Sequence, residues 1–255
     1  MMSSTTQKSK RIFKKAAIAA IWIILWQIAA LLLNQEILLP SPLSALKALT
    51  ELLKTLRFYL AVVLSLTRIA AGYILGVIAG VLGAVLSYRY KLFSELFTPV
   101  IKVIKAVPVA SFIVLAFVWF KSSQLPIFIS FLMVLPMVWE AVYIGLENID
   151  VKYLEMAKVF RLKPLKTFFE VKVPLIIPNF LSTALTAIGF AWKSGIAAEV
   201  ICRPSSSLGN MLQESRLYIE MPEVFALTAV VTLLSVLFEK AIKHLLRGYK
   251  YDKTE

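Results

Sequence analysis

The sequence has few of the residues that enzymes use for acid–base or metal chemistry. Its 255 residues include one cysteine, Cys202, one histidine, His244, and two aspartates, Asp150 and Asp252. A lone cysteine excludes an internal disulfide, and a histidine in a polar tail is typical of a solvated side chain. The sequence also lacks a G-x-x-x-x-G-K-S/T phosphate loop, an H-E-x-x-H motif and a C-x-x-C pair. We therefore predict no catalytic residue, no metal site and no cofactor bound by this chain.

Charged residues are scarce as well. They make up 17% of the chain, whereas 59% is hydrophobic and the mean hydropathy is +0.79. A soluble domain carries about 25% charged residues, so this composition predicts an all-α integral membrane protein in a lipid bilayer. A net charge of +13 would suggest nucleic acid as the partner of a soluble protein. In a membrane protein it reports topology, and we expect no nucleic-acid partner.

Six apolar runs are long enough to cross a membrane at about 20 residues per span. They cover about 16–33, 61–87, 100–120, 125–146, 175–201 and 224–246. The first run follows a basic segment, but it is long for a signal peptide and no convincing cleavage site follows it. We interpret it as an uncleaved first helix.

Lysine and arginine are distributed unevenly around these runs. With the N-terminus in the cytoplasm, eighteen of the 28 lie in inner segments, six lie in outer segments and four lie within spans. This excess agrees with the positive-inside rule. The pattern predicts six transmembrane helices, both termini in the cytoplasm, and a single transmembrane domain over 1–255.

An amphipathic segment separates the first two spans. Leucines recur at helical spacing over about 42–57, opposite Lys47, Glu51 and Lys54. Ser41 can cap this helix and Pro42 suits its first position. The pattern indicates a short helix on the outer membrane surface. An ordinary connector that packs on the bundle is an equally good interpretation.

Small residues form a stripe in the second span. Gly72, Gly76, Gly80 and Ala84 lie four residues apart and therefore share one helix face. Such a stripe lets a neighbouring backbone approach closely in lipid. We interpret it as a helix-packing surface without chemistry of its own.

Two prolines interrupt later spans. Pro108 and Pro136 each remove a backbone donor in the middle of an apolar run. Irregular backbone at membrane depth is tolerated where it is buried in protein or lines a cavity. The prolines favour a transport path over simple structural kinks, although both interpretations stay open.

Charged and aromatic residues in the fourth and fifth spans are candidates for this path. They are Glu140, Trp192, Lys193 and Glu199. A charge near the bilayer centre is costly and should face protein or water. We expect Lys193 to face an internal cavity, where it favours an anionic solute or pairs with a carboxylate such as Glu140. The alternative is that Lys193 reaches the outer headgroups.

The longest inner loop, about 147–174, combines basic and apolar residues. Its short predicted helix, over 154–162, contains Leu154, Glu155, Met156, Ala157, Phe160, Arg161 and Leu162. Apolar side chains in a cytoplasmic loop need a surface against which they are buried. That surface belongs either to a partner or to the chain's own bundle.

The same loop resembles a known signature. Glu155-Met156-Ala157, then Arg161, then Val171-x-Val173-Pro174 is similar to the E-A-A, G, I-x-L-P signature of ABC importer permeases of the type I fold, with the intervals intact. Further segments resemble the nitrate/sulfonate/taurine branch of that family: Leu39-Pro40-Ser41-Pro42, Ser65-x-x-Arg68-x-x-x-Gly72, Lys105-x-x-Pro108, Ala191-Trp192, Ala198-Glu199 and Leu208-Gly209. Met156 and Arg161 depart from the signature. Because Arg161 replaces the usual glycine, the turn after the short helix must use a negative φ or accept strain.

The resemblance implies the permease subunit of an ATP-driven importer in a bacterial-type cell membrane. Its expected partners are a second permease copy, two nucleotide-binding ATPase subunits that hold ATP and Mg²⁺, and an extracytoplasmic substrate-binding protein. The residues of the 154–162 helix would contact the ATPase. The expected cargo is a small solute, such as a sulfonate, nitrate, taurine or a thiamine precursor.

Two other classes of function remain as alternatives. One is an ATP-independent carrier or channel, and the other is a membrane-embedded lipid-modifying enzyme. The second is disfavoured because such sites gather several carboxylates or histidines. Co-purification of an ATPase subunit would separate the importer from both.

Overall fold

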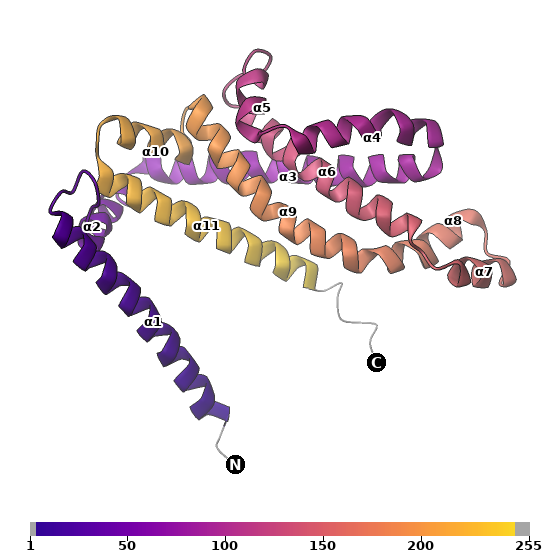
Figure 1. Cartoon of the computed structure of the whole chain (residues 1–255), viewed down its shortest axis with the longest axis horizontal. Coiled ribbons are helices and arrows are strands. Elements are labelled where there is room, and N and C mark those ends of the chain that lie inside the picture. Colours follow the sequence, from indigo (N-terminus) through magenta and orange to yellow (C-terminus); the bar gives the residue numbers. More distant parts are fainter. Residues whose placement is uncertain (1–3, 248–255) are drawn as a thin grey trace. The chain divides into compact units, whose positions relative to one another are not determined.

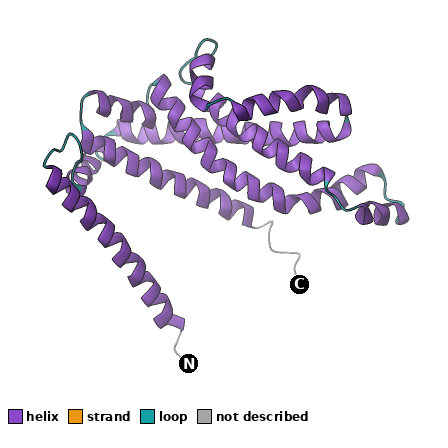
Figure 2. Ribbon diagram, viewed as in Figure 1, coloured by secondary structure: helices purple, strands orange, loops and turns teal. Residues whose placement is uncertain are grey.

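The computed structural model describes residues 4–247, and every regular element within them is helical (Figures 1 and 2). The elements are α1 (Ser4–Leu33), α2 (Pro42–Leu52), α3 (Leu56–Arg89), α4 (Lys91–Ala106), α5 (Val109–Ala116), α6 (Leu125–Glu147), α7 (Val151–Val159), α8 (Pro164–Thr167), the π-helical turn η1 (Phe168–Lys172), α9 (Val173–Cys202), α10 (Leu208–Leu217) and α11 (Met221–Arg247).

Four helical stretches are long and apolar enough to cross a membrane. They are Leu56–Arg89, Leu125–Glu147, Pro164–Cys202 and Met221–His244. The pair α4 and α5 forms a fifth span if its two helices, bent by 106°, are counted together. Within the described residues, α1 contributes the shorter apolar helix Ala20–Leu33. By length and composition the described residues therefore contain four or five spans, where the sequence predicted six.

The break between α4 and α5 has a local cause. Pro108 has no backbone N–H and disfavours helical backbone at the residue before it. Val107 accordingly has an extended backbone, with ψ of 133°, and ends α4, while Pro108 begins the next turn. The predicted continuous span over 100–120 is thus two helices. Pro136, by contrast, lies within a continuous α6.

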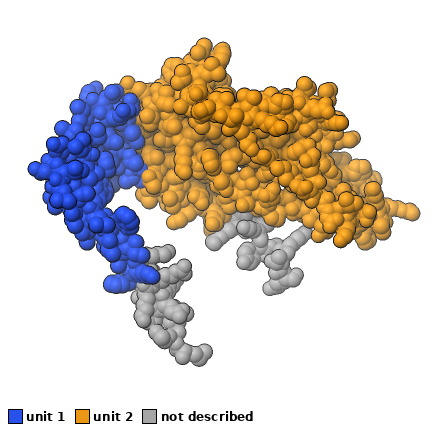
Figure 3. Space-filling model, in the orientation of Figure 1, with its two compact units in different colours: residues 1–59, 211–230 blue, residues 60–210, 231–255 orange. Residues whose placement is uncertain are grey.

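The chain divides into two compact units, which Figure 3 colours separately. The first comprises residues 1–59 and 211–230. Within it, Ser41 caps α2 by accepting a hydrogen bond from the backbone N–H of Ser44 (3.1 Å). The helix ends at Leu52, because the backbone N–H of Thr55 bonds to the carbonyl of Leu52 and closes a turn. The amphipathic helix is therefore shorter than the 42–57 that the leucine pattern predicted.

The second unit comprises residues 60–210 and 231–255. Its helices α6 and α9 pack along each other, and α5 covers one end of this pair. The buried side chains there are Ile113, Ala116, Leu125, Ile129, Ala198 and Cys202. Close packing of these buried side chains holds the three helices together.

The small-residue stripe of α3 lies against α6. A Cβ atom added to Gly76 would lie 2.7 Å from Val134 Cβ, and one added to Gly80 would lie 2.8 Å from Val138 Cβ. A Cβ atom added to Gly72 would lie even closer to the Ile127 carbonyl oxygen, and Ala84 is fully buried. Larger residues at these positions would therefore separate the two helices.

Candidate functional site

A buried carboxylate lies at the end of α9. Glu199 is fully buried, and its Oε2 accepts hydrogen bonds from the Ser65 hydroxyl (2.7 Å) and the Gly209 backbone N–H (3.2 Å). Its Oε1 makes no hydrogen bond but lies 3.6 Å from Nη1 of Arg68. The Leu208 N–H in turn donates to the Ser65 hydroxyl oxygen (3.0 Å). We call Ser65, Arg68, Glu199, Leu208 and Gly209 the Glu199 cluster.

The cluster holds the loop that joins α9 to α10. Arg68 donates from Nη2 to the carbonyl of Ser205 (3.2 Å) and from Nη1 to that of Ser206 (3.4 Å). Arg203 and Ser206 have left-handed backbones, with φ of 50° and 51°. The Ser207 hydroxyl accepts from the N–H of Asn210 (3.1 Å) and so caps α10. These hydrogen bonds hold the loop over 203–207, with its two left-handed residues, next to the buried Glu199 carboxylate.

Two of the residues predicted to line a solute path are buried. Glu199 and Trp192 both have hydrogen-bond partners within the chain. The indole N–H of Trp192 donates to the carbonyl of Val231 (3.1 Å). Their hydrogen bonds connect α9 to α3, α10 and α11. Lys193, next to Trp192, has an exposed side chain on α9.

The expected partner of Lys193 pairs with a different lysine. Nζ of Lys105, on α4, lies 2.5 Å from Oε2 of Glu140, on α6. The side chains of Lys105 and Glu140 are 46% and 49% exposed. The ion pair lies next to the break at Pro108. In the sequence, Lys105 belongs to one of the resembling segments. Its charge inside an apolar run was the feature that could have indicated this ion pair.

The helix α7 ends in a turn that explains the glycine of the resembling signature. The N–H of Arg161 bonds to the carbonyl of Lys158 (2.9 Å), and the N–H of Leu162 bonds to that of Ala157 (3.0 Å). These are the two hydrogen bonds of a Schellman motif, whose left-handed residue is usually glycine. Arg161 occupies that position with φ of 51°. The sequence left open a negative φ or a strained backbone at Arg161, and the chain adopts the strained backbone.

Ala157, which was predicted to contact the ATPase subunit, is buried. It is only 2% exposed. The exposed residues of the predicted set are Glu155, Met156, Phe160 and Arg161, whereas Leu154 and Leu162 are half-buried. The short helix covers Val151–Val159 and is capped by the Asp150 side chain, so it begins and ends before the predicted 154–162.

Exposed apolar side chains gather in this loop. Val159 is 80% exposed and Phe160 is 71% exposed. The others with exposed side chains are Val151, Tyr153, Met156, Leu165 and Phe169. We call these seven residues the α7 apolar surface. Five of them precede the candidate span Pro164–Cys202, whereas Leu165 and Phe169 lie at its start. Exposed apolar side chains before a span are typical of a protein–protein contact.

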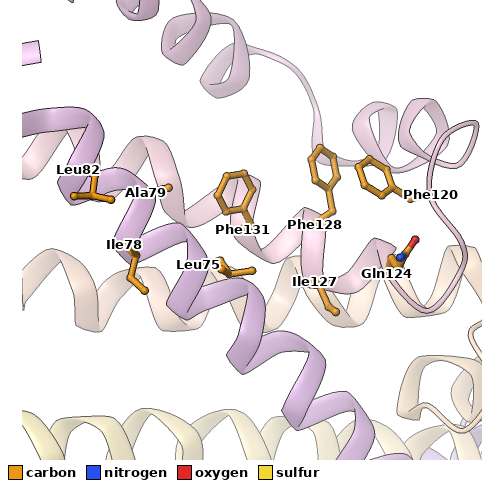
Figure 4. A pocket seen from close by; sticks show the side chains of 9 residues that line it. All are labelled: Leu75, Ile78, Ala79, Leu82, Phe120, Gln124, Ile127, Phe128 and Phe131. Carbon is orange, nitrogen blue, oxygen red and sulfur yellow. The ribbon is translucent and has the colours of Figure 1, made fainter. Parts of the chain in front are cut away.

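An apolar groove of about 520 Å³ lies between α3 and α6 (Figure 4). Its lining comprises Leu75, Ile78, Ala79, Leu82, Phe120, Gln124, Ile127, Phe128 and Phe131. Only Gln124 is polar, so the groove offers few hydrogen bonds to a polar solute. Among the described residues, no group of three histidine, cysteine or acidic side chains is arranged to hold a metal ion.

Comparisons with known proteins agree on one protein family. The family model for binding-protein-dependent transport system inner membrane components matches residues 72–251. A probable ABC transporter permease protein of Brucella melitensis is 27% identical over 208 residues, which cover 81% of this chain and 84% of that protein. The nitrate import permease protein NrtB of Leptolyngbya laminosa is 30% identical over 139 residues, covering 54% of this chain and 50% of that protein.

Two further similarities are more distant. The bicarbonate transport system permease protein CmpB of Synechocystis sp. is 26% identical over 185 residues, covering 71% of this chain and 65% of that protein. The crystal structure of an amino acid ABC transporter with histidines superimposes with a TM-score of 0.58 at 16% identity, covering 73% of this chain and 89% of that chain. This last likeness concerns the fold alone.

Proposed function

Because the chain belongs to the family of binding-protein-dependent transport system inner membrane components, we propose that it is the membrane-spanning subunit of an ATP-driven importer for a small solute. Members of this family are ABC transporter permeases, so the chain is a transport subunit and not an enzyme. Its several apolar helices agree with a multi-pass membrane protein. The energy source, the partners and the solute are parts of the proposal.

The proposed topology has six crossings and both termini in the cytoplasm of a bacterial-type cell. The apolar part of α1 supplies the first crossing, and the bent pair α4 and α5 supplies the third. The distribution of lysine and arginine supports this orientation. It places the loop with α7 in the cytoplasm. The whole chain, 1–255, acts as one permease domain in this proposal.

The α7 apolar surface carries the proposal of ATPase coupling. Val159 and Phe160 are largely exposed at the end of a helix that has charged side chains, including Glu155, beside them. Aromatic side chains of this kind are enriched at the centres of protein interfaces. We propose that α7 docks on a separate nucleotide-binding subunit. The small side chain of Ala157 would allow α7 to pack closely on the rest of its own loop.

The assembly would contain two copies of this chain, two ATPase subunits and an extracytoplasmic substrate-binding protein. ATP and Mg²⁺ would bind to the ATPase subunits, and this chain would bind no cofactor. The solute path would use exposed charged positions on the helices, among them Glu140 and Lys193. Relatives named for nitrate and bicarbonate transport support a small solute. Sulfonates, nitrate, taurine and thiamine precursors all remain within the proposed class.

Co-purification tests the coupling surface. The tagged chain should bring down the ATPase subunit from detergent-solubilised membranes, and the substitution Phe160→Asp should reduce the recovered ATPase about tenfold. That reduction corresponds to a loss of about 1.4 kcal/mol, at the lower edge for a buried aromatic at an interface. ATP-dependent uptake should fall in proportion.

Tyr218→Asp provides the matched control, because Tyr218 is 77% exposed in the loop between α10 and α11. It should leave ATPase recovery unchanged. Wild-type ATPase recovery with Phe160→Asp would remove α7 from the interface. Absence of any ATPase subunit with the wild-type chain would instead support an ATP-independent carrier.

A further inference from the structure

The helix α4 has two exposed faces of different chemistry. One face carries apolar side chains: Leu92, Leu96, Val100 and Val103 are between 48% and 69% exposed. At 100° per residue these four lie within about 80° of one another around the helix. A third face, with Phe93, Phe97 and Ile101, packs toward Trp139 of α6 or is buried.

The other exposed face is polar. It carries Ser94, Glu95, Thr98, Lys102 and Lys105, which lie within about 100° of one another. A hollow of about 420 Å³ runs along it, lined by Ser94, Glu95, Thr98, Pro99 and Lys102. We call Ser94, Glu95, Thr98, Lys102 and Lys105 the α4 polar face.

The charges on this face are unequally paired. Glu95 lies 3.9 Å from Lys91, and Glu140 of α6 lies 2.5 Å from Lys105. Among the described residues, no carboxylate lies within 4.0 Å of Lys102. Three lysines thus face two carboxylates, and Lys102 lies between the two pairs along the helix. The excess charge is positive and is exposed.

Lipid can cover only one of the two exposed faces. The acyl chains of a bilayer suit the face of Leu96, Val100 and Val103, but they provide no hydrogen bonds to Lys102 or Thr98. Charged side chains in spans face the bundle interior or water. With its 16 residues, α4 extends about 24 Å. Lipid headgroups alone cannot contact a polar face of that length.

We propose that the α4 polar face, together with Glu140, lines the solute path and that the solute is a small anion. This inference rests on the proposed transport function. Lys102 provides the unpaired cation that attracts the anion, while Glu140 neutralises Lys105 and limits how tightly the anion is held. A path needs binding that is favourable enough for entry and weak enough for release.

Thiol accessibility tests the path without knowledge of the natural solute. Cys202 is the only native cysteine and is buried, so Cys202→Ala gives a background for single substitutions. Thr98→Cys on the polar face is compared with Val103→Cys on the apolar face, in membrane vesicles that contain the assembled transporter. The probes are an anionic sulfonatoethyl and a cationic trimethylammonioethyl methanethiosulfonate, each normalised to its rate with a free thiol.

We expect Thr98→Cys to react about tenfold faster with the anionic probe than with the cationic one, because a cationic surface concentrates anions. The added substitution Lys102→Gln should remove most of that preference. Val103→Cys should be protected from both probes. When vanadate traps the ATPase subunits in the presence of the binding protein, the rate from the cytoplasmic side should fall.

Three results would overturn the proposal. Protection of Thr98→Cys equal to that of Val103→Cys would place the polar face against protein. Equal normalised rates for the two probes would remove anion selectivity. A rate that trapping leaves unchanged would place α4 in ordinary solvent at the membrane surface. Recovery of the ATPase subunit with the same variants is measured in parallel, so a failure of this inference is distinguishable from a failure of the proposed function.

Discussion

The two loops that flank α9 differ in how far the chain itself covers their side chains. After α9, Arg68 and Ser207 supply hydrogen bonds to the loop over 203–207, and Glu199 is fully buried beneath it. Before α9, the loop with α7 leaves Val159 and Phe160 largely exposed. The first loop is covered by its own chain, whereas the second exposes apolar side chains. In the proposed assembly another molecule would cover them.

This difference separates two kinds of substitution. In the loop after α9, removal of a contact leaves a buried polar group without a partner, so folding should suffer. In the loop before α9, removal of an exposed apolar side chain leaves the fold intact, so assembly should suffer instead. Two of the ion pairs of the second unit differ in the same way, since Arg68 and Glu199 are 12% and 0% exposed, while Lys105 and Glu140 are about half exposed.

The largest effect is expected for Arg68→Ala. This substitution leaves the Glu199 carboxylate buried without its counter-charge and removes the donor to two loop carbonyls. Breaking a buried ion pair on one side costs about 3–5 kcal/mol. The yield of monodisperse protein and its thermal stability in detergent should both fall sharply. The double variant with Glu199→Gln should recover part of the loss, because the amide oxygen can still accept from Ser65 and Gly209.

Lys105→Ala is the matched control for the ion pair. Exposed pairs contribute about 0.2–1 kcal/mol, so its thermal stability should stay close to that of the wild type. A loss with Lys105→Ala as large as that with Arg68→Ala would break the comparison, because it would show that exposure does not distinguish the two pairs.

A smaller effect is expected for Gly209→Ala. An added Cβ would meet Cβ of Glu199 and lie 2.6 Å from the backbone nitrogen of Val200, neither of which can move freely. Overpacking of this kind costs about 1–3 kcal/mol. Gly189→Ala is the control, since a Cβ there has nothing within 4 Å and should be neutral or slightly stabilising. Equal stability of the two variants, measured by heating in detergent, would contradict the close approach of α10 to α9.

The positions of most helices could be predicted from the sequence. The predicted runs over 61–87, 125–146, 175–201 and 224–246 are confirmed as helices, with ends within a few residues, because apolar runs bounded by charges are a strong local signal. Pro108 was predicted to interrupt its span, but the division into two separate helices was not predicted, and neither was α10. Its sequence is polar and lacks the apolar periodicity of a span, although Ser207 provides a local N-cap. The contact of Gly209 with the Glu199 carboxylate is a tertiary contact that no local pattern reveals.

The candidate site was less predictable, because it depends on contacts between distant segments. The sequence predicted Trp192 and Glu199 in one span, but it could not show that Ser65 and Arg68 would contact Glu199 from a helix more than 120 residues earlier. It likewise could not choose between Lys105 and Lys193 as the partner of Glu140. The resembling segments with Ser65, Arg68, Glu199 and Gly209 were the available signal, since the structure brings all four together.

The smallest expected effect lies in the loop before α9 and has the opposite sign. Arg161 has a left-handed backbone with φ of 51° at the position where a Schellman motif favours glycine. That conformation costs a residue with a Cβ about 1–2 kcal/mol, whereas glycine loses about 0.5–1 kcal/mol of chain entropy. Arg161→Gly should therefore raise the thermal stability of the detergent-solubilised chain by an amount that corresponds to about 0.5–1 kcal/mol.

Arg161→Ala distinguishes backbone strain from loss of the side chain. Alanine removes the exposed guanidinium but keeps the Cβ, so it retains the unfavourable left-handed backbone and should not reproduce the gain. Asparagine tolerates this conformation better than most residues, and Arg161→Asn should fall between alanine and glycine. If alanine stabilised the chain as much as glycine, the gain would come from removing a positive charge in a loop that already carries several lysines. In that case the left-handed turn would cost little, and strain would no longer distinguish this loop from its counterpart after α9.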